Sequence, residues 1–232
     1  MIDRTLNYGR HVLKRFLCAS DGFASALDIG AGRGDDLMTV REANPSARLF
    51  AIECFPANVD ILKEKGVAVH SLNIEKDPFP FEAESLDLVI GNQILEHTKE
   101  IFWILDQASR VLKVGGHLFL GVPNLAALHN RILLALGRQP SPLKNNSAHV
   151  RGYTKPDVLD LLKSGFPGGY RLRDFGGSNF YPFPPIMARP LARLFPSMAW
   201  GIFFDFVKEK PYRGQFLEYP RQMQLETNFF LG

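Results

Sequence analysis

The stretch that decides the fold is Ala26-Leu-Asp-Ile-Gly30-Ala-Gly32-Arg-Gly34-Asp-Asp36. It starts as a short apolar run, which is typical of a buried parallel strand, and continues into a turn with three glycines. Residues 35–43 then predict a helix, which Asn44-Pro45 ends. A glycine-rich turn between strand and helix lets a ligand approach the backbone closely, and the helix N-terminus adds N–H donors. The stretch therefore predicts a ligand site at the end of a first strand.

The glycine spacing and a later carboxylate indicate the kind of ligand. A dinucleotide fingerprint would place a glycine at position 35, where the chain has Asp35. Asp28 suits a ligand with a positive end, such as an ammonium group. Glu53 ends the second predicted strand, 19 residues after Gly34, close to the offset at which a carboxylate meets both hydroxyls of a ribose. The alternative is a surface carboxylate that only ends a strand.

Strand and helix patterns alternate through the first half of the chain. We predict strands at residues 26–30, 49–52, 67–72, 86–90 and 117–122, and helices at 35–43, 57–65 and 98–113. This alternation predicts a doubly wound sheet, in which ligands bind beyond the carboxyl ends of the strands. Later in the chain we predict helices at residues 125–136 and 154–164, two further strands at 170–175 and 200–208, and a Pro- and aromatic-rich cap segment at 179–196.

Composition narrows the function classes. The 232 residues suit one domain, and the two cysteines, Cys18 and Cys54, cannot build a disulfide framework or a tetrathiolate metal site. Without a transmembrane-length apolar run or a secretory leader pattern, we expect a soluble, cytoplasmic protein. Residues 1–122 hold 13 Lys/Arg against 17 Asp/Glu, and residues 123–232 hold 14 against 7. The basic residues are scattered, which favours a mildly basic surface over a dedicated polyanion site and makes nucleic acid an unlikely partner.

Five ordered segments resemble the class I S-adenosylmethionine-dependent methyltransferases, in the group often called type 11. They are residues 28–34, 52–53, 71–81, 85–97 with its Leu-Glu-His, and 111–123 with its Leu-Lys-Val-Gly-Gly turn. The resemblance implies an α/β fold: a doubly wound, mostly parallel seven-stranded sheet (Rossmann-like) with a helical and aromatic cap from the C-terminal part. We expect a single domain with a helical segment at 1–25, a cofactor-binding core at 26–123, and a cap insertion with edge strands at 124–232.

The resemblance also implies a set of residues around S-adenosylmethionine. Asp28, Gly30, Gly32 and Gly34 would surround its methionine part, and Glu53 would bind the ribose beside Cys54. Asn73, where relatives usually have Asp, would accept from the adenine amino group, and Ile74 would contact the ring. Asn92 and Gln93 would lie near the methionine part. Tyr8 or Arg10 could reach the cofactor carboxylate, or be ordinary residues of a helix surface.

Two histidines are the candidate catalytic residues. Methyl transfer mainly requires alignment, and a general base is needed only if the acceptor loses a proton. Gln93 and His97 are four residues apart, so we expect them to share a helix face, with His97 toward the acceptor. His149 lies in Ala148-His-Val-Arg151, which resembles a segment in relatives encoded with glycan and lipid biosynthesis genes; Arg151 could bind a phosphate or carboxylate. Either histidine could instead have a packing role.

The expected reaction is methyl transfer to a small-molecule, glycan or lipid-linked acceptor, at oxygen. No His/Asp/Glu cluster in the sequence has the metal-ligand spacing of the catechol-type enzymes, so we expect a metal-free reaction. A non-catalytic cofactor-binding module and an RNA methyltransferase are the alternatives. The apolar cap could line the acceptor pocket, lie on a membrane surface, or pack against the sheet edge or the partner of a homodimer.

Overall fold

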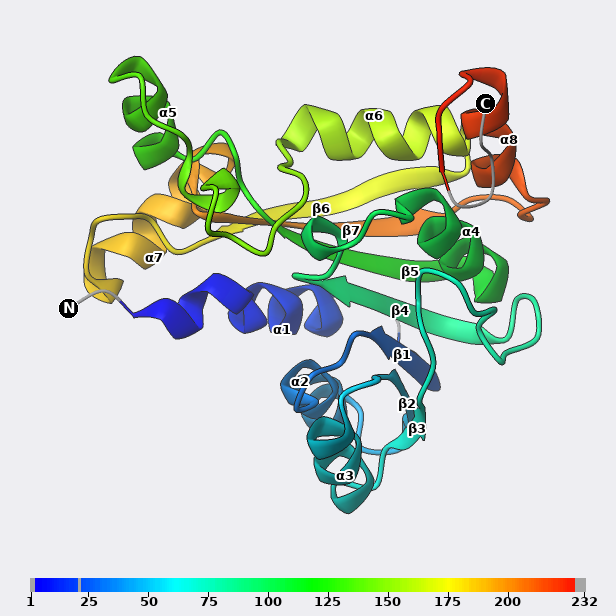
Figure 1. Cartoon of the computed structure of the whole chain (residues 1–232). Coiled ribbons are helices and arrows are strands. Elements are labelled where there is room, and N and C mark those ends of the chain that lie inside the picture. The colour runs from blue at the N-terminus through cyan, green and yellow to red at the C-terminus, as the bar shows by residue number, and fades with distance from the viewer. Residues whose placement is uncertain (1–2, 21, 228–232) are drawn as a thin grey trace.

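The computed structural model describes residues 3–20 and 22–227, and it contains one seven-stranded sheet in the order β3-β2-β1-β4-β5-β7-β6 (Figure 1). All strands run parallel except β7, which is antiparallel to both of its neighbours. The expected doubly wound, mostly parallel sheet is confirmed. The strands are β1 (Ser25–Ile29), β2 (Arg48–Ile52), β3 (Ala68–His70), β4 (Leu86–Asn92), β5 (Leu112–Pro123), β6 (Tyr170–Ser178) and β7 (Gly201–Lys208).

Helices cover both faces of the sheet (Figure 1). One apolar core joins α1, α2 and α3 to the first face, and a second joins α4, α6 and α8 to the opposite face. Every residue of β1 is buried because both faces are covered, which explains its continuous apolar run. The helices are α1 (Arg10–Cys18), α2 (Asp35–Ala43), α3 (Pro56–Glu64), α4 (Ile101–Val111), α5 (Leu128–Ala135), α6 (Lys155–Gly165), α7 (Pro185–Leu194) and α8 (Gln215–Gln222). Four short 3-10 helices complete the elements of the described residues: η1 (Arg4–Tyr8), η2 (Leu95–His97), η3 (Ser141–Leu143) and η4 (Pro196–Met198).

One predicted helix is wrong in a way that affects the site. The expected helix at 98–113 begins only at Ile101, residues 98–100 lie outside any helix, and residues 95–97 form the short η2. Gln93 has a φ of 54°, so the chain turns sharply where β4 ends. Gln93 and His97 therefore do not share an α-helix face, as their spacing predicted.

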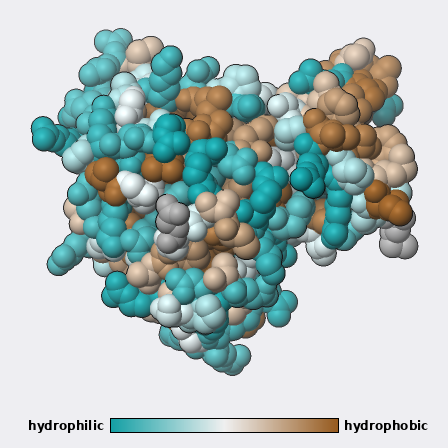
Figure 2. Space-filling model, turned by 180° about the vertical axis from the view of Figure 1, so that it is seen from behind, coloured by the Kyte–Doolittle hydropathy of each residue, from teal (hydrophilic) through white to brown (hydrophobic). Residues whose placement is uncertain are grey.

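The cap consists of residues 124–153 and 179–200, which contain α5, η3, α7 and η4. It has a small core of its own, made by Phe180, Ala188, Ala192 and Ala199. Its outer surface exposes apolar side chains, which appear at the upper right of Figure 2. The largest exposures are on Ile132, Leu134, Leu136, Val150, Ile186, Leu194 and Phe195. Within the part of the chain that the structure describes, no helix is long and apolar enough to span a bilayer.

Candidate functional site

The glycine turn after β1 is shaped for close approach. Gly30, Gly32 and Gly34 all have positive φ, between 54° and 79°. A Cβ added at Gly30 would lie 2.6 Å from Ile94, whereas one added at Gly32 would meet no atom within 4 Å. Gly30 is thus required by backbone conformation and packing, and Gly32 by conformation alone, with open space beside it. A ligand can reach the backbone of the turn at Gly32.

Glu53 connects the end of β2 to this turn. Its side chain accepts from the backbone N–H of Gly32 at 2.7 Å and from that of Phe55 at 2.8 Å. The residue is 9% exposed, so the two backbone contacts fix the carboxylate while part of it still faces solvent. A carboxylate has about four acceptor positions, so two backbone contacts leave capacity for the hydroxyls of a ribose.

The end of β1 carries excess negative charge. Asp28 is 3% exposed, and burial, reinforced by the nearby carboxylates of Asp36 and Glu53, raises its pKa well above the usual range. Arg10 lies 2.9 Å from Asp35 and 3.3 Å from Asp36. The backbone of Asp28 is paired within the sheet, whereas its carboxylate forms no hydrogen bond with the described residues. A ligand with an ammonium or sulfonium group fits this end of the sheet, because it would supply the missing positive charge.

The other predicted cofactor residues follow β2, β3 and β4. Cys54 is exposed, and Ile74 packs against the core while remaining half-buried. Asn73 uses its side-chain oxygen locally, accepting from the N–H of Glu75 at 2.9 Å. The side chain of Asn92 donates to the carbonyl of Tyr8 at 2.9 Å and to Asp36 at 2.7 Å, which ties η1 and α2 to the end of β4.

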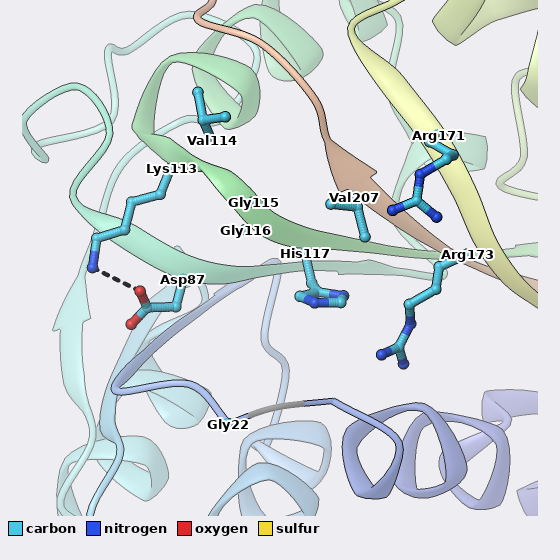
Figure 3. Close-up of a pocket in the computed structure, with 10 residues that line it drawn as sticks. All are labelled: Gly22, Asp87, Lys113, Val114, Gly115, Gly116, His117, Arg171, Arg173 and Val207. Carbon is cyan, nitrogen blue, oxygen red and sulfur yellow. Dashed lines mark hydrogen bonds and ion pairs between the residues drawn. The ribbon is translucent and has the colours of Figure 1, made fainter.

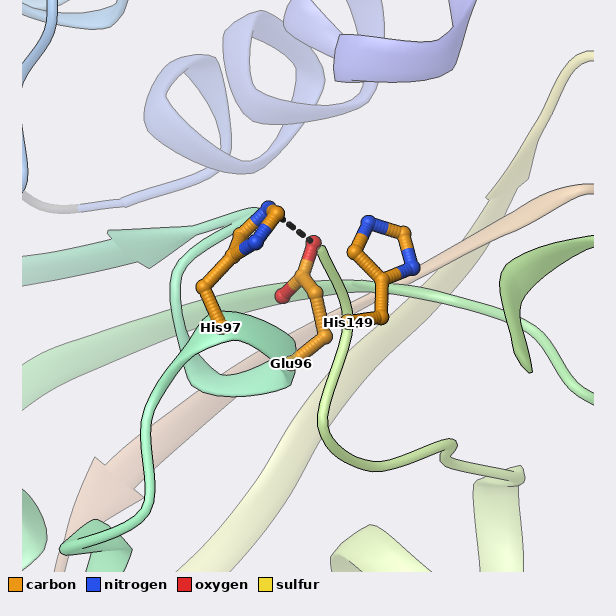
Figure 4. A group of neighbouring side chains, drawn as sticks. All are labelled: Glu96, His97 and His149. Atoms are coloured by element: carbon orange, nitrogen blue, oxygen red, sulfur yellow. Dashed lines mark ion pairs between the residues drawn. The ribbon is translucent and has the colours of Figure 1, made fainter. Parts of the chain in front are cut away.

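His97 and His149 are brought together although 52 residues separate them (Figure 4). Their ring centroids are 4.6 Å apart. The segment that carries His149 docks onto η2, because Val150 donates to the Glu96 carbonyl at 2.8 Å and Arg151 to the Lys99 carbonyl at 2.7 Å. Arg151 thus holds backbone in place, and its guanidinium is engaged at the position where the sequence suggested a phosphate or carboxylate ligand.

Glu96 lies between the two histidines and was not assigned a role from the sequence. It is 1% exposed, and neither carboxylate oxygen has a hydrogen-bond partner among the described residues. Burial raises the pKa of Glu96 to about 8. The only sequence signal for it was its place in the Leu-Glu-His that follows the fourth strand; periodicity would have made it an ordinary helix-surface acid.

The three residues open into a cavity at the carboxyl end of β4. The cavity has a volume of about 460 Å³, and a second one of about 280 Å³ shares its Arg4, Asn7, His149 and Trp200 walls. Gln93 also lines the larger cavity, and its buried side-chain nitrogen has no hydrogen-bond partner among the described residues. A pocket with unpartnered polar groups suits a ligand that carries its own donors and acceptors. The larger cavity is lined by Arg4, Thr5, Asn7, Tyr8, Gln93, Glu96, His97, His149 and Trp200.

A cavity of about 400 Å³ lies at the opposite end of the parallel strands, near the start of β4 and β5 (Figure 3). Its charges are already neutralised: Lys113 lies 2.6 Å from Asp87, and Arg173 pairs with the buried Asp205. Ligands of doubly wound sheets bind at the other end. This cavity is therefore not the candidate site.

Comparison with known proteins agrees with this geometry. Residues 27–118 match the family described as "Methyltransferase domain". An uncharacterized 37.1 kDa protein in a Streptomyces fradiae transposon is 32% identical over 45% of this chain and 31% of its own length. The ubiquinone biosynthesis O-methyltransferase of Xanthomonas axonopodis is 27% identical over 69% of this chain and 68% of its own length. This chain thus spans less than a third of the first relative and about two thirds of the second.

The fold has close counterparts among solved structures. A methyltransferase of Thermotoga maritima, a possible histamine N-methyltransferase, superposes with a TM-score of 0.61 at 16% identity, over 89% of this chain and 92% of that one. At that identity the likeness concerns the fold, whereas the domain match concerns the sequence of residues 27–118. The chain therefore has the fold of S-adenosylmethionine-dependent methyltransferases, and its residues 27–118 match a methyltransferase domain.

Proposed function

We propose that the protein transfers a methyl group from S-adenosylmethionine to an oxygen atom of a small-molecule, glycan or lipid-linked acceptor. The observation that carries this proposal is the cavity at the end of β4, where Gln93, His97 and His149 line one wall. Gly30 packs against Ile94, which lies next to Gln93, so the cavity adjoins the glycine turn. The similarity to a ubiquinone biosynthesis O-methyltransferase supports oxygen as the acceptor atom.

The cofactor would lie across the carboxyl ends of β1, β2 and β4. Glu53 would accept from the ribose hydroxyls, and a positively charged methionine part would favour the ionised form of the buried Asp28. In the same arrangement Cys54, Asn73 and Ile74 border the adenosine. Gly32 leaves the space through which the cofactor approaches the turn.

His97 and His149 would act on the acceptor. When bound, the cofactor supplies an electrophilic methyl group, so the protein's main contribution is to align the acceptor oxygen with it. Burial lowers the pKa of His149, and the neighbouring His97 lowers it further, which keeps the ring neutral and able to accept a proton. A neutral imidazole in the cavity can take the acceptor's hydroxyl proton as the new bond forms.

The cap suits an acceptor held at a lipid surface. Ile186 and Leu194 of α7 are 83% and 71% exposed, and Arg189 and Arg193 lie on the same helix. Apolar side chains beside arginines are typical of helices that lie on anionic membranes.

Both cysteines are free and exposed, which fits a reducing compartment such as the cytoplasm.

Transfer from labelled S-adenosylmethionine to a panel of acceptors tests the reaction. The panel should hold phenols, sugars, lipid-linked acceptors and RNA. We expect label on a hydroxyl oxygen. Binding of the cofactor with no transfer to any acceptor would favour a non-catalytic module, and transfer only to RNA would replace the proposed acceptor.

Sedimentation with anionic vesicles tests the lipid surface. We expect the doubly substituted Ile186→Asp, Leu194→Asp protein to bind the vesicles at least tenfold more weakly than the unchanged protein. Val114→Asp is the matched control, because Val114 is 44% exposed and lies at the opposite end of the sheet. Equal binding by all three proteins would refute the membrane contact. Weaker self-association of the double variant, without any vesicle binding, would indicate a homodimer instead.

A further inference from the structure

Glu96, His97 and His149 form the cluster from which the inference starts (Figure 4). One possible ligand atom from each residue lies within 4.8 Å of the other two, and Nε2 of His97 is 4.0 Å from Oε1 of Glu96. Ligand atoms around a tetrahedral zinc ion, with bonds of about 2.0–2.1 Å, are roughly 3.3 Å apart. Side-chain movements of about 1 Å would therefore bring all three atoms to coordination distance.

Glu96 is the least explained residue of the cluster. It is 1% exposed, and both of its carboxylate oxygens lack a hydrogen-bond partner among the described residues. Nδ1 of His149 is likewise buried without a partner. Burying such groups is costly unless something binds them, and buried carboxylates usually pair with a cation or coordinate a metal. The cavity beside them is large enough to admit an ion with its water.

The second nitrogen of His97 is held in the way that metal-binding histidines require. Nδ1 of His97 lies 3.4 Å from the carbonyl of Ala148, which leaves Nε2 free to face Glu96. Nδ1 of His149 is buried without a hydrogen-bond partner among the described residues. Metal-ligating histidines commonly donate their other N–H to a backbone carbonyl, which fixes both the tautomer and the ring orientation.

We propose that Glu96, His97 and His149 bind a divalent transition-metal ion of the zinc type. Two imidazoles and one carboxylate are the ligand set of open zinc sites, and imidazole ligands favour zinc-like ions over magnesium or calcium. Three protein ligands leave a coordination position that faces the cavity. No sequence pattern indicated this site, because His149 is 52 positions from His97 and the segment 148–153 must dock onto η2 to complete it.

The part that the ion plays in the reaction rests on the proposed function. An ion at the open position would bind the acceptor oxygen and lower the pKa of its hydroxyl, as zinc does for bound water. The acceptor would then lose its proton to water near neutral pH. With the ion bound, the two imidazoles would act as its ligands and would no longer serve as the general base. The binding of the ion itself depends only on the three side chains.

Zinc binding to the whole chain tests the proposal. Protein stripped with a chelator and desalted is titrated with Zn²⁺ by calorimetry, and the retained metal is counted by mass spectrometry. We expect one ion per chain. Glu96→Gln, His97→Ala and His149→Ala should each weaken binding at least tenfold. His11→Ala is the matched control, because His11 is an exposed histidine of α1 that lies outside the cluster.

A cobalt readout covers the case in which a variant fails to fold. Co²⁺ bound to the unchanged protein should give the intense visible absorption of a four-coordinate site, and added Zn²⁺ should abolish it. No bound ion in the unchanged protein, or equal binding by folded cluster variants and the His11 control, would overturn the proposal. Zinc binding without methyl transfer to any acceptor would contradict the proposed function and support the metal site. Methyl transfer by a protein that binds no zinc would support the proposed function and contradict the metal site.

Discussion

Replacing Glu53 by alanine tests the cofactor half of the site most directly. The carboxylate is 9% exposed and already accepts from the N–H groups of Gly32 and Phe55. In the proposed arrangement it also accepts from the two ribose hydroxyls. A hydrogen bond to a charged group contributes about 1.5–3 kcal/mol. The loss of one such bond would therefore weaken binding by about 10- to 150-fold, since about 1.4 kcal/mol corresponds to a factor of ten.

The assay is calorimetric titration with S-adenosylhomocysteine, the demethylated form of the cofactor. Glu53→Ala also leaves the Gly32 N–H without its acceptor, so the estimate is a lower bound. Glu53→Gln keeps the size of the side chain and one acceptor oxygen. Its dissociation constant should therefore lie between those of the unchanged protein and Glu53→Ala. Glu42→Ala is the control, because Glu42 is an exposed acid of α2 that pairs with Lys14 away from the site. A dissociation constant for Glu53→Ala equal to that of the control would remove Glu53 from the cofactor site.

Three further predictions concern the acceptor half and the scaffold. His97→Ala should lower turnover by about 100-fold or more and change the affinity for S-adenosylhomocysteine far less. Unchanged turnover would show that His97 takes no part in the reaction. Asp205→Asn should lower the free energy of unfolding by about 3 kcal/mol in urea titrations, because the buried carboxylate accepts from Arg173 and lies 2.8 Å from His117. Thr154→Ala should lower the free energy of unfolding by about 1 kcal/mol in the same assay, since Thr154 caps α6 in a capping box. An unchanged free energy of unfolding would mean that solvent replaces the cap.

The sequence predicted most of the sheet because its signals there are local. Helix α2 was predicted at its observed bounds, since a glycine turn begins it and Asn44-Pro45 ends it. The helix predicted at 154–164 is likewise confirmed as α6, which begins at Lys155 with Thr154 as its N-cap. Strand β3 is shorter than predicted, and α8, which has Pro220 inside it, was not predicted. These elements depend on neighbours that are distant in the chain, so local patterns describe them poorly.

The candidate site was predicted unevenly for the same reason. The residues predicted to bind the cofactor are consecutive or follow strand ends, and parallel strands bring their carboxyl ends to one edge of the sheet. The acceptor side depends on how the cap returns to the sheet. The sequence singled out His97 and His149 separately, but their contact depends on the docking of residues 148–153 onto η2, where Val150 donates to the Glu96 carbonyl. The importance of Glu96 follows from its burial, which no local pattern showed.

Gly30 couples the two halves of the site. A Cβ at this position would lie 2.6 Å from the end of the Ile94 side chain, and Ile94 stands between Gln93 and the η2 turn that carries Glu96. The glycine turn is thus packed directly against the residue that leads into the histidine cluster. A side chain at position 30 would displace Ile94 and disturb the turn that carries Glu96 and His97, because closely packed atoms leave no space to absorb it.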